Sequence, residues 1–200
     1  IQGNLGPTSS YLSSLLSYEY KIILKNLPKP LSVKFIDELK NVKTPSESEL
    51  KKYKNWCESG LMYENFAREI YEVTGDKKWR SSNESRMLSK DIFWTILYSS
   101  NSNNNEFKLL FSKVFPSIYN FICKIKSLIK MKRSHRMFPI LMQGVESFIW
   151  VENILPKLDS MKIPYLFIHD SVLIKDKDKD RTELVILEKF FMYKITPKLK

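Results

Sequence analysis

The sequence predicts an α+β fold that is mostly helical and carries one small antiparallel β-hairpin. Apolar residues recur every three or four positions over most of the 200 residues, which is the spacing of amphipathic helices. After Pro164, by contrast, two short apolar runs at 165–168 and 172–174 flank a polar triplet, as in a hairpin. Hydrophobic residues make up 43% of the chain, which is enough for a packed core.

Loop composition and capping residues divide the helical part into segments. Thr44 and Pro45 open one helix, with Pro45 in its first turn. Gly75 ends the next helix, and Asn83 or Ser85 caps the one after it. Residues 99–105 are Ser and Asn only, which predicts a loop. Residues 176–180 alternate Asp with Lys and predict a solvated connector. The expected helices span 8–25, 45–56, 61–74, 83–98, 107–130 with an interruption or a kink at Pro116, and 137–158, and a last helix or strand spans 182–195.

Charge and cysteine content narrow the class of protein. The chain has 33 lysines and arginines against 22 aspartates and glutamates, and its net charge of +11 favours a polyanionic partner. Cys57 and Cys123 form no CxxC pair, which argues against a disulfide scaffold or a structural zinc site and favours a reducing compartment. No apolar run approaches the ~20 residues that span a bilayer. These features predict a cytoplasmic protein, a phage or mobile-element protein included, that does not enter membranes.

The helix expected at 83–98 carries the first candidate site. Arg86, Lys90, Trp94 and Tyr98 follow one another at i,i+4 spacing, so a helix displays two cations and then two aromatic rings in one stripe. Such a stripe can hold a triphosphate at one end and stack a base at the other. The alternative is an ordinary amphipathic helix whose cations extend to solvent while Trp94 and Tyr98 lie in the core.

The triplet of the hairpin carries the second candidate site. His169 and Asp170 fall at the tight turn, where a metal ion can approach the carboxylate from one side. The alternative is that Asp170 only forms an Asx-type turn with Ser171.

Four short motifs in order resemble one known superfamily. Arg86, Lys90, Trp94 and Tyr98 look like motif B, the nucleotide-binding fingers helix of family A DNA polymerases and single-subunit phage-type RNA polymerases, and His169-Asp170 in an apolar hairpin looks like their palm motif C. Phe115-Pro116 with Tyr119 is similar to the Phe-Pro segment after motif B. Pro139 with Gln143-Gly144 is similar to the start of the long palm helix. The resemblance covers residues 80 to 175.

The resemblance implies a template-directed nucleotidyltransferase that uses two Mg²⁺ ions, a DNA or RNA primer-template and nucleoside triphosphates. Arg86 would contact the outer phosphates, and Lys90 the α-phosphate as a catalytic charge and candidate proton donor. Trp94 and Tyr98 would line the base and sugar site. Asp170 would be a catalytic metal ligand. Gln143 would touch the template or primer, and His169 would lie beside the primer terminus.

Departures from the family pattern leave the product open and predict a fragment. Ser99 stands where glycine usually follows the tyrosine, and Ser171 after the motif C aspartate is similar to the RNA polymerase branch. The second metal-binding aspartate, of motif A, is not found, because none precedes Asp37. We therefore expect it just upstream of Ile1 and expect this chain to be inactive alone. The expected regions are 1–80 after motif A, 81–136 with fingers-like helices, and 137–200 with the palm-like helix and hairpin.

A basic run predicts contact with the duplex backbone, where each neutralised phosphate adds salt-dependent affinity. The alternative is a solvated lysine-rich surface. The functional alternative to a polymerase is a catalytically inactive or unrelated helical nucleic-acid-binding domain. The run comprises Lys124, Lys126, Lys130, Lys132, Arg133, His135 and Arg136.

Overall fold

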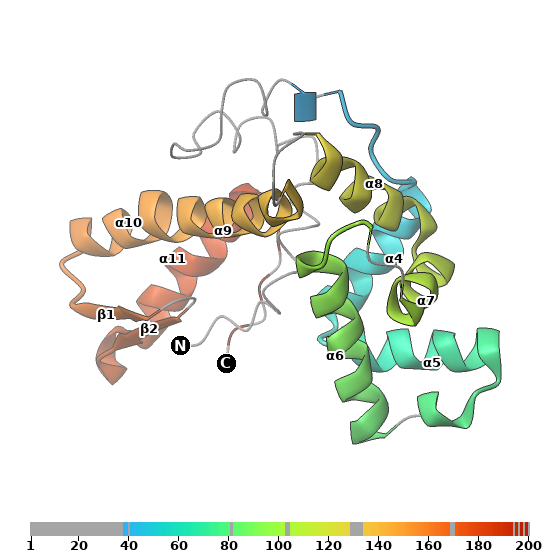
Figure 1. The fold of residues 1–200 in the computed structure, drawn as a ribbon. Helices are drawn as coiled ribbons and strands as arrows, with labels where there is room; N and C mark the ends of the chain where they lie inside the picture. The colour runs from blue at the N-terminus through green and yellow to red at the C-terminus, as the bar shows by residue number, and fades with distance from the viewer. Residues whose placement is uncertain are drawn as a thin grey trace. The chain divides into compact units, whose positions relative to one another are not determined.

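The computed structural model describes residues 38–39, 41–80, 82–102, 105–128, 134–168, 171–193, 195, 197 and 199. Helices dominate these ranges and one antiparallel pair of strands accompanies them (Figure 1), so the predicted fold class is confirmed. The described residues fall into two compact units, one ending at Leu141 and the other beginning at Met142. The expected helix at 8–25 and Asp37 lie outside the described residues, and the three-region division stays a prediction.

The first unit is helical. It contains α4 (Glu47–Glu58), α5 (Met62–Thr74), the short 3₁₀ helix η1 (Lys77–Trp79), α6 (Asn83–Tyr98), α7 (Glu106–Val114), α8 (Pro116–Ser127), the 3₁₀ helix η2 (Ser134–Arg136) and the start of α9 (Met137–Ile149).

The ends of these helices follow from local chemistry. Ser46 is the N-cap of α4 and accepts from the Glu49 amide, so Pro45 precedes the helix and does not lie in its first turn as predicted. Gly75 ends α5 in the left-handed conformation, at φ 69°. Ser82, and not Asn83 or Ser85, caps α6, and it forms a reciprocal capping box with Ser85.

The helix expected over 107–130 is interrupted at Pro116, as one of the two predicted forms has it, and consists of α7 and α8. Phe115 leaves the helical region, at φ −134° and ψ 65°, and Pro116 then starts α8 at its first position. Proline favours this division because it lacks an N–H and crowds the preceding turn, while its fixed φ suits a helix start.

Aromatic side chains form the centre of the first unit. The ring of Phe66 lies 5.1 Å from Phe93 and 5.8 Å from Phe111, and it stacks on Phe115 at 6.2 Å between ring centroids. All four rings are buried. The cluster joins α5, α6 and α7, and it packs against one face of α6.

A carboxylate also joins α4 to α8. Glu49 accepts from the backbone amides of Ser117, at 3.0 Å, and Ile118, at 3.2 Å. These amides lie in the first turn of α8, where no intrahelical carbonyl is available to them. Glu49 therefore caps a helix that lies 68 positions away in the sequence.

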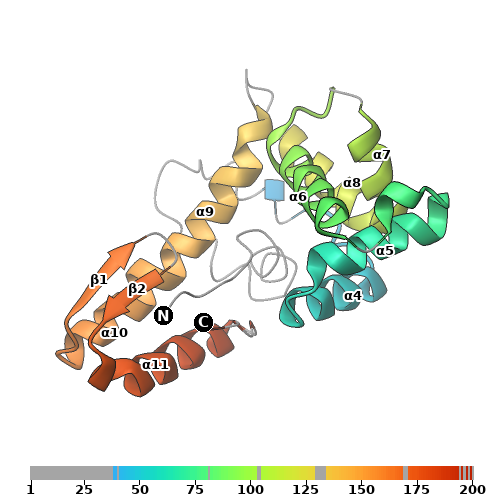
Figure 2. The ribbon, with the colours of Figure 1, turned by 90° about the horizontal axis from the view of Figure 1, so that it is seen from below.

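The second unit contains the hairpin, in which β1 and β2 are antiparallel with Ile168 paired to Ser171. The ring of Trp150 lies 5.5 Å from Phe167 of β1 and 6.0 Å from Phe190 of α11, which brings the hairpin and α11 together around it (Figure 2). The elements after α9 are a π-helical turn (Trp150–Ile154), α10 (Leu155–Ser160), β1 (Tyr165–Ile168), β2 (Ser171–Ile174), the 3₁₀ helix η4 (Asp176–Asp178) and α11 (Lys179–Met192).

Two predictions for this unit need correction. The helix expected over 137–158 contains the π-turn, because Pro156 has no N–H and its ring would crowd the carbonyl four residues earlier in a regular helix. Asn153 in this turn donates to the Phe148 carbonyl and accepts from the Tyr193 hydroxyl at 3.1 Å. The connector at 176–180 is not wholly solvated, since Asp178 is buried ahead of α11.

Candidate functional site

The four residues of the predicted stripe lie along α6, and the name α6 stripe is used for them below. Arg86 and Lys90 are half-buried, while Trp94 is 54% and Tyr98 43% exposed. The interpretation that places Trp94 and Tyr98 in the core is therefore wrong. The core of the unit is contacted by other positions of the same helix, namely Ser85, Ser89, Ile92, Phe93, Ile96 and Leu97.

Tyr63 and Glu64 of α5 support the cationic end of the α6 stripe. The ring of Tyr63 lies 5.6 Å from the Arg86 guanidinium carbon and 5.7 Å from Lys90 Nζ, which are cation–π distances. Arg86 Nε donates to Glu64 Oε1 at 2.7 Å. Burial raises the pKa of Tyr63 above its usual value, and the nearby Arg86 partly offsets that rise. The arginine is thus oriented through Nε, and its terminal nitrogens have no hydrogen-bond partner among the described residues.

The aromatic end of the α6 stripe is a stacked pair. The ring centroids of Trp94 and Tyr98 are 4.8 Å apart, and the ring planes differ by 25°. Each ring restricts the other, which lowers the entropy lost when a third flat group is added. Two exposed, ordered rings next to two cations form a surface that suits a flat anionic ligand.

Two lysines from other helices reach the carboxyl end of α6. Lys126 of α8 donates to the carbonyls of Ile96 and Ser99, the latter at 2.9 Å, and Lys108 of α7 donates to the carbonyl of Ser100. Lys126 is only 3% exposed. It is therefore not part of the basic surface that the sequence predicts. The burial signal was the spacing of Lys126 from Ile118, Ile122 and Ile125, which share its helix face.

Burial also changes the acidity of both lysines. Burial lowers the pKa of Lys126 to about 8, with a smaller lowering from the Lys108 charge and an opposing effect from Cys123. Burial likewise lowers the pKa of Lys108. Both amino groups therefore carry their charge at a cost that an exposed lysine does not have.

The other predicted site residues are only partly described. His169, Asp170, Lys130, Lys132 and Arg133 lie outside the described residues. Within the first unit Arg136 is exposed, and within the second unit Gln143 is exposed on α9. Strands β1 and β2 end on either side of residues 169 and 170, so the predicted hairpin is confirmed while the position of its carboxylate stays a prediction.

The predicted Mg²⁺ site also stays a prediction. Across the described ranges, no three His, Cys, Asp or Glu side chains gather as ligands for a metal ion. The expected ligand, Asp170, does not belong to these ranges.

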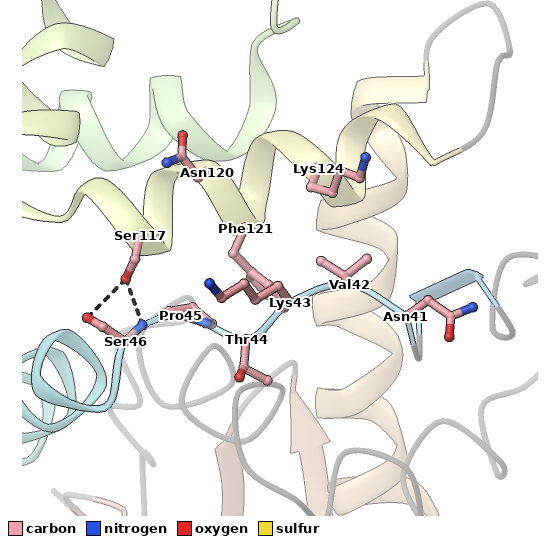
Figure 3. Close-up of a pocket in the computed structure, with 10 residues that line it drawn as sticks. All are labelled: Asn41, Val42, Lys43, Thr44, Pro45, Ser46, Ser117, Asn120, Phe121 and Lys124. Carbon is pink, nitrogen blue, oxygen red and sulfur yellow. Dashed lines mark hydrogen bonds between the residues drawn. The ribbon is translucent and has the colours of Figure 1, made fainter.

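A hollow of about 780 Å³ lies in the first unit, between residues 41–46 and α8 (Figure 3). Its lining combines the apolar side chains of Val42, Pro45 and Phe121 with the cations Lys43 and Lys124. Ser46 and Ser117 hydrogen-bond to each other at one end of it. None of its lining residues belongs to α6, so the α6 stripe and not this hollow carries the candidate site.

The chain matches no protein-family model, no curated protein and no solved structure. Within the part of the chain that the structure describes, every helix is too short or too polar to traverse a bilayer.

Proposed function

We propose that the chain is the nucleotide-binding and template-binding part of a template-directed nucleotidyltransferase, similar to family A DNA polymerases and single-subunit phage-type RNA polymerases. One observation carries the proposal, namely that α6 presents two cations and a stacked aromatic pair on its accessible side. The α6 stripe has one residue in each successive turn and extends over about 18 Å of helix. The phosphate end and the base end of one ligand therefore meet different side chains.

The cationic end supplies the affinity for phosphate in this proposal. Arg86 holds Glu64 through Nε and offers its terminal nitrogens to the outer phosphates. Lys90 acts as a point charge one turn later, near the α-phosphate. Tyr63 lies against both cations and limits the conformations that they adopt.

The aromatic end supplies base and sugar contacts. Stacking on an aromatic side chain contributes about 1–3 kcal/mol per base, and it tolerates any base because each has a π-face. Trp94 and Tyr98 therefore bind all four nucleotides, and the template selects among them. Whether the sugar is deoxyribose or ribose is not determined by stacking.

The hairpin supplies the catalytic carboxylate in the proposal. Asp170 would hold Mg²⁺, together with the motif A aspartate that the resemblance places upstream. When bound, the two ions would activate the attacking hydroxyl and stabilise the leaving pyrophosphate. The exposed Arg136 and Gln143 are available to the primer-template, and the net charge of +11 favours that polyanion.

Triphosphate binding to the 200-residue chain tests the proposal. Arg86→Ala and Lys90→Ala should each weaken binding of a fluorescent nucleoside triphosphate about fivefold to twentyfold, since each removes one charge-assisted contact. Lys113→Ala, which removes an exposed lysine of α7, is the matched control and should change affinity less than twofold. Equal effects in all three variants would show that only the net charge matters and would overturn the assignment of the α6 stripe.

Primer extension separates a polymerase from its alternative. In a chain extended upstream through the expected aspartate, nucleotide addition should occur, and Asp170→Asn should abolish it while leaving duplex affinity almost unchanged. Salt-dependent binding of nucleic acid with no triphosphate binding would instead favour a catalytically inactive or unrelated nucleic-acid-binding domain.

A further inference from the structure

The carboxyl end of α6 is held by side chains and not by the usual glycine. The last four carbonyls of a helix have no intrahelical partner, and a glycine in the left-handed conformation commonly closes the end. Here Ser99 ends α6 at φ −83° and ψ 157°, outside that region. Lys126 instead donates to two of these four carbonyls, those of Ile96 and Ser99.

Lys108 continues this arrangement by one residue. Its amino group donates to the carbonyl of Ser100, so α7 and α8 each send one lysine to the end of α6. The pair is called the lysine clamp below. Both lysines are buried, since Lys108 is 5% and Lys126 3% exposed. The negative carbonyl end of the α6 helix dipole favours their positive charge.

The lysine clamp restrains Tyr98, because it holds the turn of α6 in which Tyr98 lies. Tyr98 is the last residue of α6, and its ring stacks on Trp94. Fraying of the last helical turn would move Tyr98 while leaving Arg86 and Lys90, three turns and two turns earlier, in place. Hydrogen bonds at Ile96 and Ser99 lie on both sides of Tyr98 and oppose that fraying.

We propose that Lys126, assisted by Lys108, is a positioning residue that holds Tyr98 in the aromatic pair, and that the closure of this clamp is linked to loss of a proton. The inference rests on the proposed function, because it assigns the clamp a role in binding the base. The groups that face Lys126 are the carbonyls of α6, Lys108 of α7 and Cys123 of its own helix.

The sign of the linkage follows from the direction of the pKa shift. In the closed clamp the pKa of Lys126 is about 8, whereas a lysine exposed by opening has its ordinary value of 10.5. Opening therefore takes up a proton between these two values. The opening equilibrium should fall up to tenfold for each pH unit from about 8 towards 10.5, and it should be independent of pH below about 8.

Hydrogen exchange of the peptide that covers residues 96–100 tests the clamp without any ligand. After correction for base catalysis of exchange, opening in the wild-type chain should fall as pH rises above 8. Lys126→Met removes the group whose pKa is about 8, so the decrease in opening that begins near pH 8 should be lost, and any decrease that remains at higher pH belongs to Lys108. Lys113→Met, on the exposed side of α7, should keep the decrease that begins near pH 8. A decrease that still begins near pH 8 in Lys126→Met would overturn the proton linkage.

Lys108→Met provides a second variant if Lys126→Met fails to fold. The charge of Lys108 lowers the pKa of Lys126, so its removal should move the start of the slope to higher pH. If opening in Lys108→Met began to fall at the same pH as in the wild-type chain, or at a lower pH, the proton linkage through Lys126 would be contradicted.

Triphosphate affinity at pH 9 tests the positioning role, because the charge of Lys126 is then largely lost and its hydrogen bonds remain. Lys126→Met should weaken binding about threefold to tenfold, and Lys113→Met less than twofold. Unchanged affinity in Lys126→Met would overturn the positioning role. A wild-type chain that shows the exchange slope but binds no triphosphate would overturn the proposed function and leave the proton-linked clamp standing.

Discussion

The α6 stripe and the β1–β2 hairpin are built in different ways. The α6 stripe lies on one helix whose opposite face contacts a buried aromatic cluster, and each of its four side chains is set by helical spacing. The second predicted site falls at residues 169 and 170, and two strands of four residues each flank it. Its strands also expose apolar side chains, at Leu166, Ile168 and Leu173.

The difference concerns what fixes a functional side chain. In the first unit a large aromatic core fixes the helix, and the helix then fixes the whole stripe. In the second unit the ring of Trp150 packs against Phe167 of β1 on one side and Phe190 of α11 on the other. The position of the exposed face of α6 should therefore depend on the core beneath it and little on its surface side chains, whereas the hairpin should depend on local contacts.

The largest expected loss of stability follows substitution of Phe66 in the helical unit. Phe167 in the hairpin is the phenylalanine with which it is compared. Phe66→Ala removes a fully buried ring that contacts three others, and it should lower the free energy of unfolding by about 3–5 kcal/mol. Phe167→Ala removes a half-buried ring with one ring neighbour, and it should cost about half as much.

Urea unfolding followed by circular dichroism measures both changes. The m-value should be the same in both variants, so that the shift in midpoint reports stability. A Phe167→Ala cost equal to or above that of Phe66→Ala would show that the hairpin is as firmly packed as the helical unit.

The sequence predicts the parts of the site that depend on local periodicity. The i,i+4 spacing of Arg86, Lys90, Trp94 and Tyr98 places them on one side of α6, and the structure confirms that placement. The two apolar runs at 165–168 and 172–174 likewise predict the hairpin, which the structure confirms, although Ser171, expected in the polar triplet, is the first residue of β2 and pairs with Ile168. In both cases a short stretch of chain determines the geometry.

The parts that depend on distant contacts were not predictable in the same way. Lys126 lies in a run of basic residues, and although its spacing from the isoleucines of α8 indicates burial, no local pattern shows that it reaches the carbonyls of Ile96 and Ser99. Glu49 caps a helix 68 positions away, and no local pattern connects the two. The π-turn before Pro156 was also missed, because proline marks a disturbed helix without stating which form the disturbance takes.

The intermediate effect tests the contact between α4 and α8. Glu49→Ala leaves the first amides of α8 without their acceptor, and it should cost about 1–2 kcal/mol of stability. Glu47→Ala is the matched control, since it removes an exposed glutamate from the same first turn of α4 and should cost about 0.5 kcal/mol. Equal costs would mean that Glu49 acts through the dipole of α4 alone and that the aromatic core holds α8 unaided.

The smallest expected effect concerns Glu64, which orients Arg86 but also brings a negative charge to the site. Glu64→Gln keeps an oxygen that accepts from Arg86 Nε and removes the charge. Triphosphate binding should then tighten about twofold to fivefold, since the anion is no longer repelled across a partly exposed pair.

Glu72→Gln is the control for Glu64→Gln, because Glu72 is an exposed glutamate of the same helix, eight positions and about 12 Å further along it, and the change in net charge is identical. It should leave the affinity within the error of the titration. If Glu64→Gln weakened binding instead, the charged form of Glu64 would be needed to hold Arg86 in place. Orientation would then outweigh repulsion, and the cationic end of the α6 stripe would depend on a local contact in the same way as the hairpin.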